Sequence, residues 1–148
     1  MYPECNCDDK FRTAEDYRDH LPCPSRTRAD KLDKVFAKQR EFMDMLVEHD
    51  KFPEYPVDLT TKPGQRFFKE VAFNMIEELM EASFTLKNRQ HKLSDDTELD
   101  FPHFVEELGD ALAFFVEGLI VCGITAEQIY AEYDRKNAIV RKRLTDGY

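Results

Sequence analysis

The sequence predicts an all-α fold, an antiparallel four-helix bundle with a small N-terminal zinc-finger-like segment. Apolar residues recur at three- and four-residue steps in four stretches after residue 28, as on the inner face of an amphipathic helix. Five Gly and seven Pro are few for an all-β chain, which needs a turn about every ten residues. Short connections separate the four stretches, which favours antiparallel neighbours.

The first two helices are predicted on either side of a proline-rich connector. The first covers residues 28–49 and the second residues 64–89. Between them, Pro53, Pro56 and Pro63 prevent one continuous helix. The apolar positions of the first helix are Leu32, Val35, Phe36, Phe42, Met43, Leu46 and Val47. The expected inner face of the second comprises Phe67, Phe68, Val71, Met75, Leu79, Ala82 and Leu86.

Capping residues define the last two helices. Asp100 is an N-cap candidate, and Pro102 in the first turn is typical of a helix start. This third helix runs to Cys122, where Gly123 ends it. Its inner face is expected to comprise Phe104, Leu108, Ala111, Leu112, Phe115 and Leu119. Thr125 and Gln128 have the spacing of a capping box, which opens a fourth helix that runs to about Arg143.

The charge balance excludes some partners. The chain has 30 acidic and 21 basic residues and a net charge of -9, so nucleic acid should repel it. No run approaches the 18 or more apolar residues of a membrane span. The first ten residues lack the basic and apolar regions of a signal peptide. We therefore expect a cytoplasmic protein with no nucleic-acid or membrane partner, whose thiols stay reduced.

The most informative residues are acids within apolar helical stretches. Glu78 and Glu81 are three residues apart, so their side chains project from one helix face. Glu107 and Asp110 repeat this spacing on the next helix. If the two helices pack antiparallel, the four carboxylates can converge at one level of the bundle.

Such a cluster needs either water or a cation. Burying a bare carboxylate costs several kcal/mol, and neighbouring like charges increase that cost. The acids therefore either form a solvated face or bind a hard divalent cation such as Mg²⁺, with Mn²⁺ as a possible substitute. A di-iron bundle would need Glu-x-x-His on two helices, and neither His91 nor His103 stands three residues after a Glu.

The acidic pattern resembles a known enzyme family. Glu77-Glu78-x-x-Glu81 followed by Glu107-x-x-Asp110 is similar to the EExxE…ExxD signature of the all-α nucleoside triphosphate pyrophosphohydrolases, which include MazG-like enzymes and dimeric dUTPases. The tail is similar to bacteriophage dCTPase/dUTPase-type enzymes, on the following residues: Gly123-Ile-Thr-Ala-Glu-Gln-Ile-Tyr, Tyr133-x-x-Lys136-Asn137, Arg143 and Gly147-Tyr148. The resemblance covers residues 28–148.

The resemblance implies an activity and residue roles. The expected reaction is Mg²⁺-dependent hydrolysis of a deoxynucleoside triphosphate to the monophosphate and diphosphate. Its metal ligands would be Glu78, Glu81, Glu107 and Asp110. Glu77 would orient or deprotonate the attacking water, Lys136 and Arg143 would neutralise phosphate charge, and Gln39 would lie near the nucleotide.

The same resemblance leaves the base open. Val140 and Leu144 stand where the family tail often has Asn and Gln. dUTP or dCTP is the leading substrate, and a purine-specific enzyme acting on dGTP or dATP, in a phage with modified DNA, is the alternative. If the protein is phage-encoded, its compartment is the host cytoplasm. Twelve Phe are more than one small bundle buries, and family members build oligomeric sites, so we expect a homo-oligomer, a dimer or tetramer.

Residues 1–24 form a separate segment rich in potential zinc ligands. Cys5-x-Cys7, twelve residues and then His20-x-x-Cys23 have the spacing of a zinc finger. Thiols without a common metal are the alternative. The segment carries more acids than bases, which favours a structural Zn²⁺ clip or a protein contact over DNA reading. A zinc-finger adaptor with merely solvated acids is therefore the competing function, of a different class from the enzyme.

Overall fold

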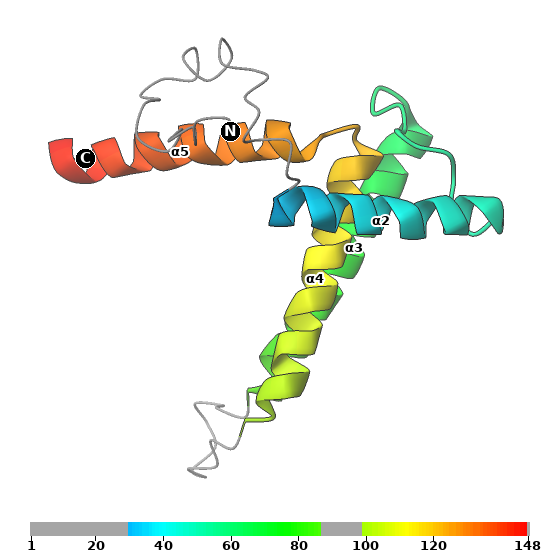
Figure 1. Cartoon of the computed structure of the whole chain (residues 1–148), viewed down its shortest axis with the longest axis horizontal. Coiled ribbons are helices and arrows are strands. Elements are labelled where there is room, and N and C mark those ends of the chain that lie inside the picture. The colour runs from blue at the N-terminus through cyan, green and yellow to red at the C-terminus, as the bar shows by residue number, and fades with distance from the viewer. Residues whose placement is uncertain (1–29, 87–98, 148) are drawn as a thin grey trace, which may run out of the picture. The chain divides into compact units, whose positions relative to one another are not determined.

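The computed structural model describes residues 30–86 and 99–147. Every regular element in these ranges is an α-helix, which confirms the all-α prediction. The helices are α2 (Lys31–Glu48), α3 (Lys62–Thr85), α4 (Phe101–Val121) and α5 (Ala126–Asp146) (Figure 1). The predicted zinc-finger-like segment, with Cys5, Cys7, His20 and Cys23, lies outside the described residues.

The chain divides into two units, each of which is described by itself. One unit is continuous, from Phe36 to Ile124, and contains most of α2, all of α3 and all of α4. Residues 30–35 and α5 belong to the other. The four-helix bundle, which requires α5 to pack with the other three helices, stays a prediction.

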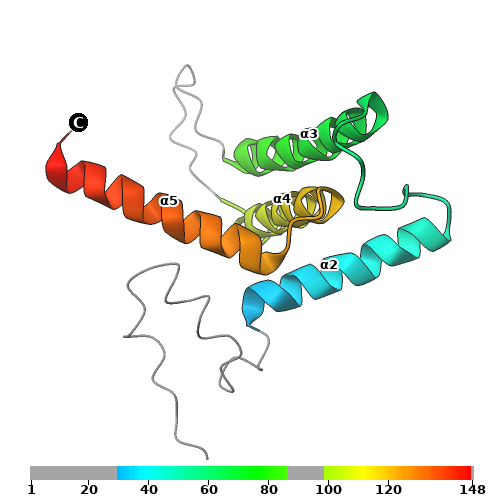
Figure 2. The ribbon, with the colours of Figure 1, turned by 90° about the horizontal axis from the view of Figure 1, so that it is seen from above.

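An antiparallel hairpin of α3 and α4 is the centre of the continuous unit, and the two helices lie side by side in both views (Figures 1 and 2). Small residues face the contact. Ala82 on α3 and Ala111 on α4 are buried, and the buried Gly118 of α4 lies against Phe68 and Val71 of α3. Side chains of this size allow the helix axes to approach closely.

The close approach of α3 and α4 explains why only some residues of their predicted inner faces are buried. Val71, Ala82, Ala111 and Leu119 are buried as predicted. The following larger residues, predicted to be inside, are exposed in the chain: Phe42, Phe68, Leu79, Leu86, Leu108, Leu112 and Phe115. Because alanine, valine and glycine fill the α3–α4 contact, the bulkier residues of these two helices lie on its flanks. Phe42 lies on α2, and this contact does not account for its exposure.

The α2 helix contributes one buried face to the same unit. Phe36 and Met43, two turns apart, are both buried, and Met43 has no exposed surface. Gln39 lies between them on the same face and donates a hydrogen bond to Glu117 of α4. The face that carries these residues is therefore turned toward α4.

The helix ends follow the predicted capping chemistry. The Asp100 side chain accepts a hydrogen bond from the His103 N–H at 3.2 Å, and α4 begins directly after it. Thr125 and Gln128 form both hydrogen bonds of a capping box. Gly123 follows α4 with φ of 74°, a left-handed conformation that glycine adopts without strain.

Three predicted boundaries need correction. The α3 helix begins at Lys62 with Thr61 as N-cap, so Pro63 lies within its first turn, where proline is tolerated, instead of before it. It ends at Thr85 instead of Arg89, because the backbone of Leu86 is extended. The last helix continues beyond Arg143 to Asp146.

Among residues 30–86 and 99–147, no single helix is long and apolar enough to cross a membrane. The α4 and α5 helices pass that test only when they are counted together across the break between them.

Candidate metal centre

Three carboxylates converge where α3 and α4 face each other. Glu78 of α3 and Glu107 and Asp110 of α4 each offer one oxygen atom, and the three atoms lie within 4.8 Å of one another. Glu107 and Asp110 share a helix face because they are three residues apart. The antiparallel pairing brings Glu78 to the same level, so three of the four predicted metal ligands meet.

The fourth predicted ligand, Glu81, lies beside this cluster. It stands one turn after Glu78 on α3 and is exposed. Glu81 and Glu107 both line an open pocket near the ends of the hairpin, together with Phe84, Thr85, Leu99, Asp100 and His103. The structure thus places Glu81 at the rim of the site and outside the group of three.

The cluster concentrates negative charge at the edge of the helix contact. Partial burial, followed by the charges of Glu81, Asp110 and Glu107, raises the pKa of Glu78. Glu107 is only 7% exposed, whereas Asp110 is exposed and Glu78 is half-buried. One side of the site is therefore held within the protein, and the other is open to water.

The donor set fits a hard divalent cation. In an octahedral Mg²⁺ site with bonds of about 2.1 Å, adjacent ligand oxygens are about 3 Å apart and opposite ones about 4.2 Å. The three carboxylate oxygens lie within 4.8 Å of one another, and their side chains would move closer together to bind such an ion. The open side would leave positions for water or phosphate oxygens.

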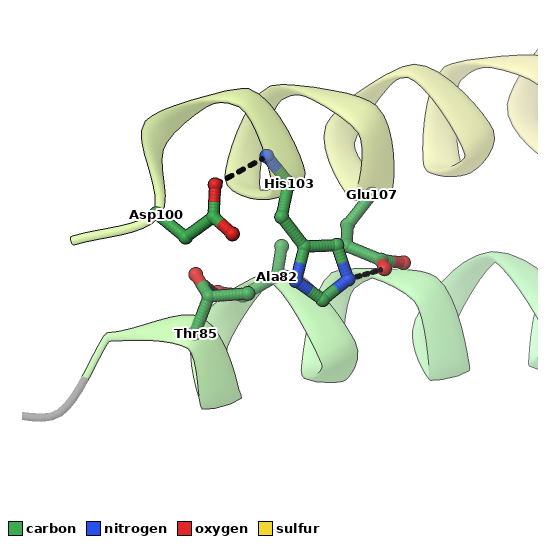
Figure 3. Close-up of polar contacts among 5 residues, drawn as sticks. All are labelled: Ala82, Thr85, Asp100, His103 and Glu107. Carbon is green, nitrogen blue, oxygen red and sulfur yellow. Dashed lines mark hydrogen bonds and ion pairs between the residues drawn. The ribbon is translucent and has the colours of Figure 1, made fainter.

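His103 contacts the buried member of the cluster, a feature that the sequence reasoning missed. Its Nε2 atom lies 2.6 Å from Oε1 of Glu107, one turn further along α4 (Figure 3). In the sequence, the four-residue spacing of His103 and Glu107 indicates this contact, because it places both residues on one helix face.

The other predicted site residues lie elsewhere. Glu77 is exposed on α3 and does not belong to the group of three. Gln39 donates from Nε2 to Oε2 of Glu117 at 3.2 Å. Lys136 and Arg143 are exposed on α5, which belongs to the other unit.

Glu117 is a second buried acid of α4. It is 5% exposed and lies seven residues, about two helical turns, after Asp110. Burial raises its pKa, and the hydrogen bond from Gln39 partly opposes that effect. The sequence marks Glu117 as a lone acid among apolar neighbours but does not identify Gln39 as its partner.

Comparison of the chain with protein-family models, with curated proteins and with solved structures finds no match.

Proposed function

We propose that the protein is a Mg²⁺-dependent deoxynucleoside triphosphate pyrophosphohydrolase, a nucleoside triphosphate diphosphatase that forms a deoxynucleoside monophosphate and diphosphate. The observation that carries the proposal is the convergence of Glu78, Glu107 and Asp110 from two antiparallel helices. These residues occupy the positions that the EExxE…ExxD pattern assigns to metal ligands. A solvated acidic face would not require acids to meet across a helix contact.

The acidic residues are proposed to have two roles, binding of the cation and orientation of the attacking water. Glu78, Glu107 and Asp110 would hold Mg²⁺, with Mn²⁺ as a substitute, and Glu81 at the rim would complete the ligand set. When bound, the cation supplies charge neutralisation to the triphosphate and activates water. Glu77, exposed on α3, retains the water-orienting role that the resemblance implies.

The remaining assignments follow the resemblance. Gln39, Lys136 and Arg143 are proposed as substrate contacts, and a pyrimidine nucleotide, dUTP or dCTP, is the proposed substrate. The proposed role is control of the nucleotide pool in the cytoplasm. The fold proposed for the whole chain is the four-helix bundle of this enzyme family.

The test is hydrolysis of each deoxynucleoside triphosphate with Mg²⁺, followed by identification of diphosphate and monophosphate. We expect release of diphosphate from dUTP or dCTP, whereas turnover of dGTP or dATP alone would select the purine-specific alternative. Glu107→Gln should abolish turnover. Glu106→Gln, which changes an exposed acid one residue earlier on the same helix, is the matched control and should retain it.

Two outcomes would contradict the proposal. Failure to hydrolyse any nucleotide with either cation would favour the zinc-finger adaptor instead. Full activity of the Glu107→Gln variant would show that the acidic cluster is not the site of the reaction.

We also propose that the chain forms a homo-oligomer, a dimer or tetramer, through an apolar stripe on α4. The stripe comprises Phe101, Val105, Leu108, Leu112 and Phe115, each at least 40% exposed. Their alternating four- and three-residue spacing matches the seam of a helix that packs on another helix. A second copy of the chain could cover this stripe. Sedimentation should give a mass above that of one 17.4 kDa chain, and Leu112→Glu should lower it.

A further inference from the structure

The contact between His103 and Glu107 suggests how the candidate metal centre is preorganised, an inference that rests on the proposed function. His103 Nε2 lies 2.6 Å from Glu107 Oε1, within ion-pair distance of the carboxylate. The Glu107 side chain is 10% exposed, whereas the His103 side chain is 52% exposed. The histidine thus approaches the buried carboxylate from the solvent side.

The carboxylate of Glu107 has two oxygens and can serve two partners. One oxygen per residue is enough to form the group with Glu78 and Asp110. If His103 holds Oε1, the second oxygen remains available to a cation. A carboxylate held in this way loses less rotational freedom when it binds a metal, which is why outer hydrogen bonds tune metal affinity.

The position of the His103 imidazole is determined by the first turn of α4. Its backbone N–H donates to the N-cap carboxylate of Asp100, so the residue lies in the anchored first turn of α4. The ring points along the helix toward Glu107, on the side of α4 that faces α3 (Figure 3). His103, Glu107 and Thr85 line the same open pocket. The ring and the carboxylate that it contacts therefore both face this pocket.

We propose that His103 is a positioning residue of the candidate metal centre, which fixes one oxygen of Glu107 so that the other is presented to the cation with Glu78 and Asp110. Loss of the imidazole would leave Glu107 with more than one orientation beside the contact. Removal of such an outer partner of a metal ligand typically weakens metal binding about 10- to 100-fold.

The test measures Mn²⁺ affinity without nucleotide, by calorimetry and by the electron paramagnetic resonance signal of the free ion. His103→Ala should weaken binding by about 10- to 100-fold. His103→Gln should restore most of the affinity, because its amide nitrogen is the same number of bonds from Cβ as Nε2 of histidine. His49→Ala, which removes an exposed histidine after α2, is the control and should bind like the unmodified chain.

The outcomes separate this inference from the proposed function. If the unmodified chain binds Mn²⁺ and His103→Ala binds it equally well or more tightly, His103 does not position Glu107, and the metal centre stands without it. If His103→Gln is as weak as His103→Ala, the N–H donor is not the relevant feature. If the unmodified chain binds no Mn²⁺, the metal centre and this inference both fail. Circular dichroism of each variant verifies that it is folded.

Discussion

Replacement of Glu117 by glutamine should stabilise the protein at neutral pH. Glu117 is 5% exposed, and its Oε2 atom accepts a hydrogen bond from Gln39 at 3.2 Å. Burial raises its pKa above the ordinary value of about 4.5, so at pH values between the two the folded protein retains a proton that the unfolded chain releases. Glutamine has the same shape, can accept the same hydrogen bond and carries no charge.

The size and sign of the effect follow from proton linkage. Below pH 4.5 the carboxyl is protonated in both states, and its burial carries no ionisation cost. Between this value and the raised pKa of the folded state, the native protein binds one more proton than the unfolded chain. Glu117 therefore lowers the free energy of unfolding by up to about 1.4 kcal/mol per pH unit in this window. The advantage of Glu117→Gln should grow across the same window and then become constant.

Urea unfolding followed by circular dichroism at several pH values from 4 to 8 measures this difference. Glu106→Gln, an exposed acid on the same helix, is the control and should give a curve parallel to that of the unmodified chain. Parallel curves for Glu117→Gln and the unmodified chain would refute the reasoning. A Glu117→Gln variant that is less stable at pH 7 would also refute it, because a favourable interaction of the ionised carboxylate would then outweigh its burial.

Further predictions concern the cation, the helix contact and the N-terminal segment. Mg²⁺ at 100 times its dissociation constant should stabilise the fold by about 2.7 kcal/mol, a rise in melting temperature of about 5–10 °C. Glu107→Gln should reduce this rise, and an unchanged rise would place the ion elsewhere. Gly118→Ala should stabilise by about 0.5–1 kcal/mol in urea unfolding, because the added Cβ would lie at an ordinary 3.6 Å from Phe68. Gly64→Ala should destabilise in the same assay, because its Cβ would overlap a backbone carbonyl; equal effects of the two changes would contradict this contrast. Elemental analysis should find one Zn²⁺ per full-length chain, and deletion of residues 1–24 should remove it while diphosphate release persists. A full-length chain without zinc would refute the finger, and a folded but inactive truncated chain would refute the separation of roles.

Local interactions explain why the helix ends were predictable. The cap of α4 at Asp100 and the capping box of Thr125 and Gln128 each depend on residues three positions apart. Exposure of Phe115 and Leu112 was not predictable in the same way, because periodicity identifies an apolar face without showing which part of it a neighbour covers. On this part of α4, the buried residue is the small Ala111, whereas its larger neighbours Leu112 and Phe115 are exposed.

The candidate site likewise contains contacts that sequence spacing predicts and a contact that it does not. Glu78, Glu107 and Asp110 were predictable because helical spacing and antiparallel pairing together determine their meeting. The contact of Gln39 with Glu117 joins residues 78 positions apart and depends on how α2 lies against α4. No sequence spacing encodes that contact, so it required the structure.

The division of the acidic cluster between two helices has a kinetic consequence. Glu78 lies on α3, and its partners Glu107 and Asp110 lie on α4, so neither helix alone presents all three oxygens. A cation that needs the three together can bind fully only after the hairpin has closed in the correct register. Such an ion should leave the rate of hairpin closure nearly unchanged and slow its opening, as a contact that forms after the transition state does. The metal centre would then set how long the native hairpin persists, independently of how quickly it forms.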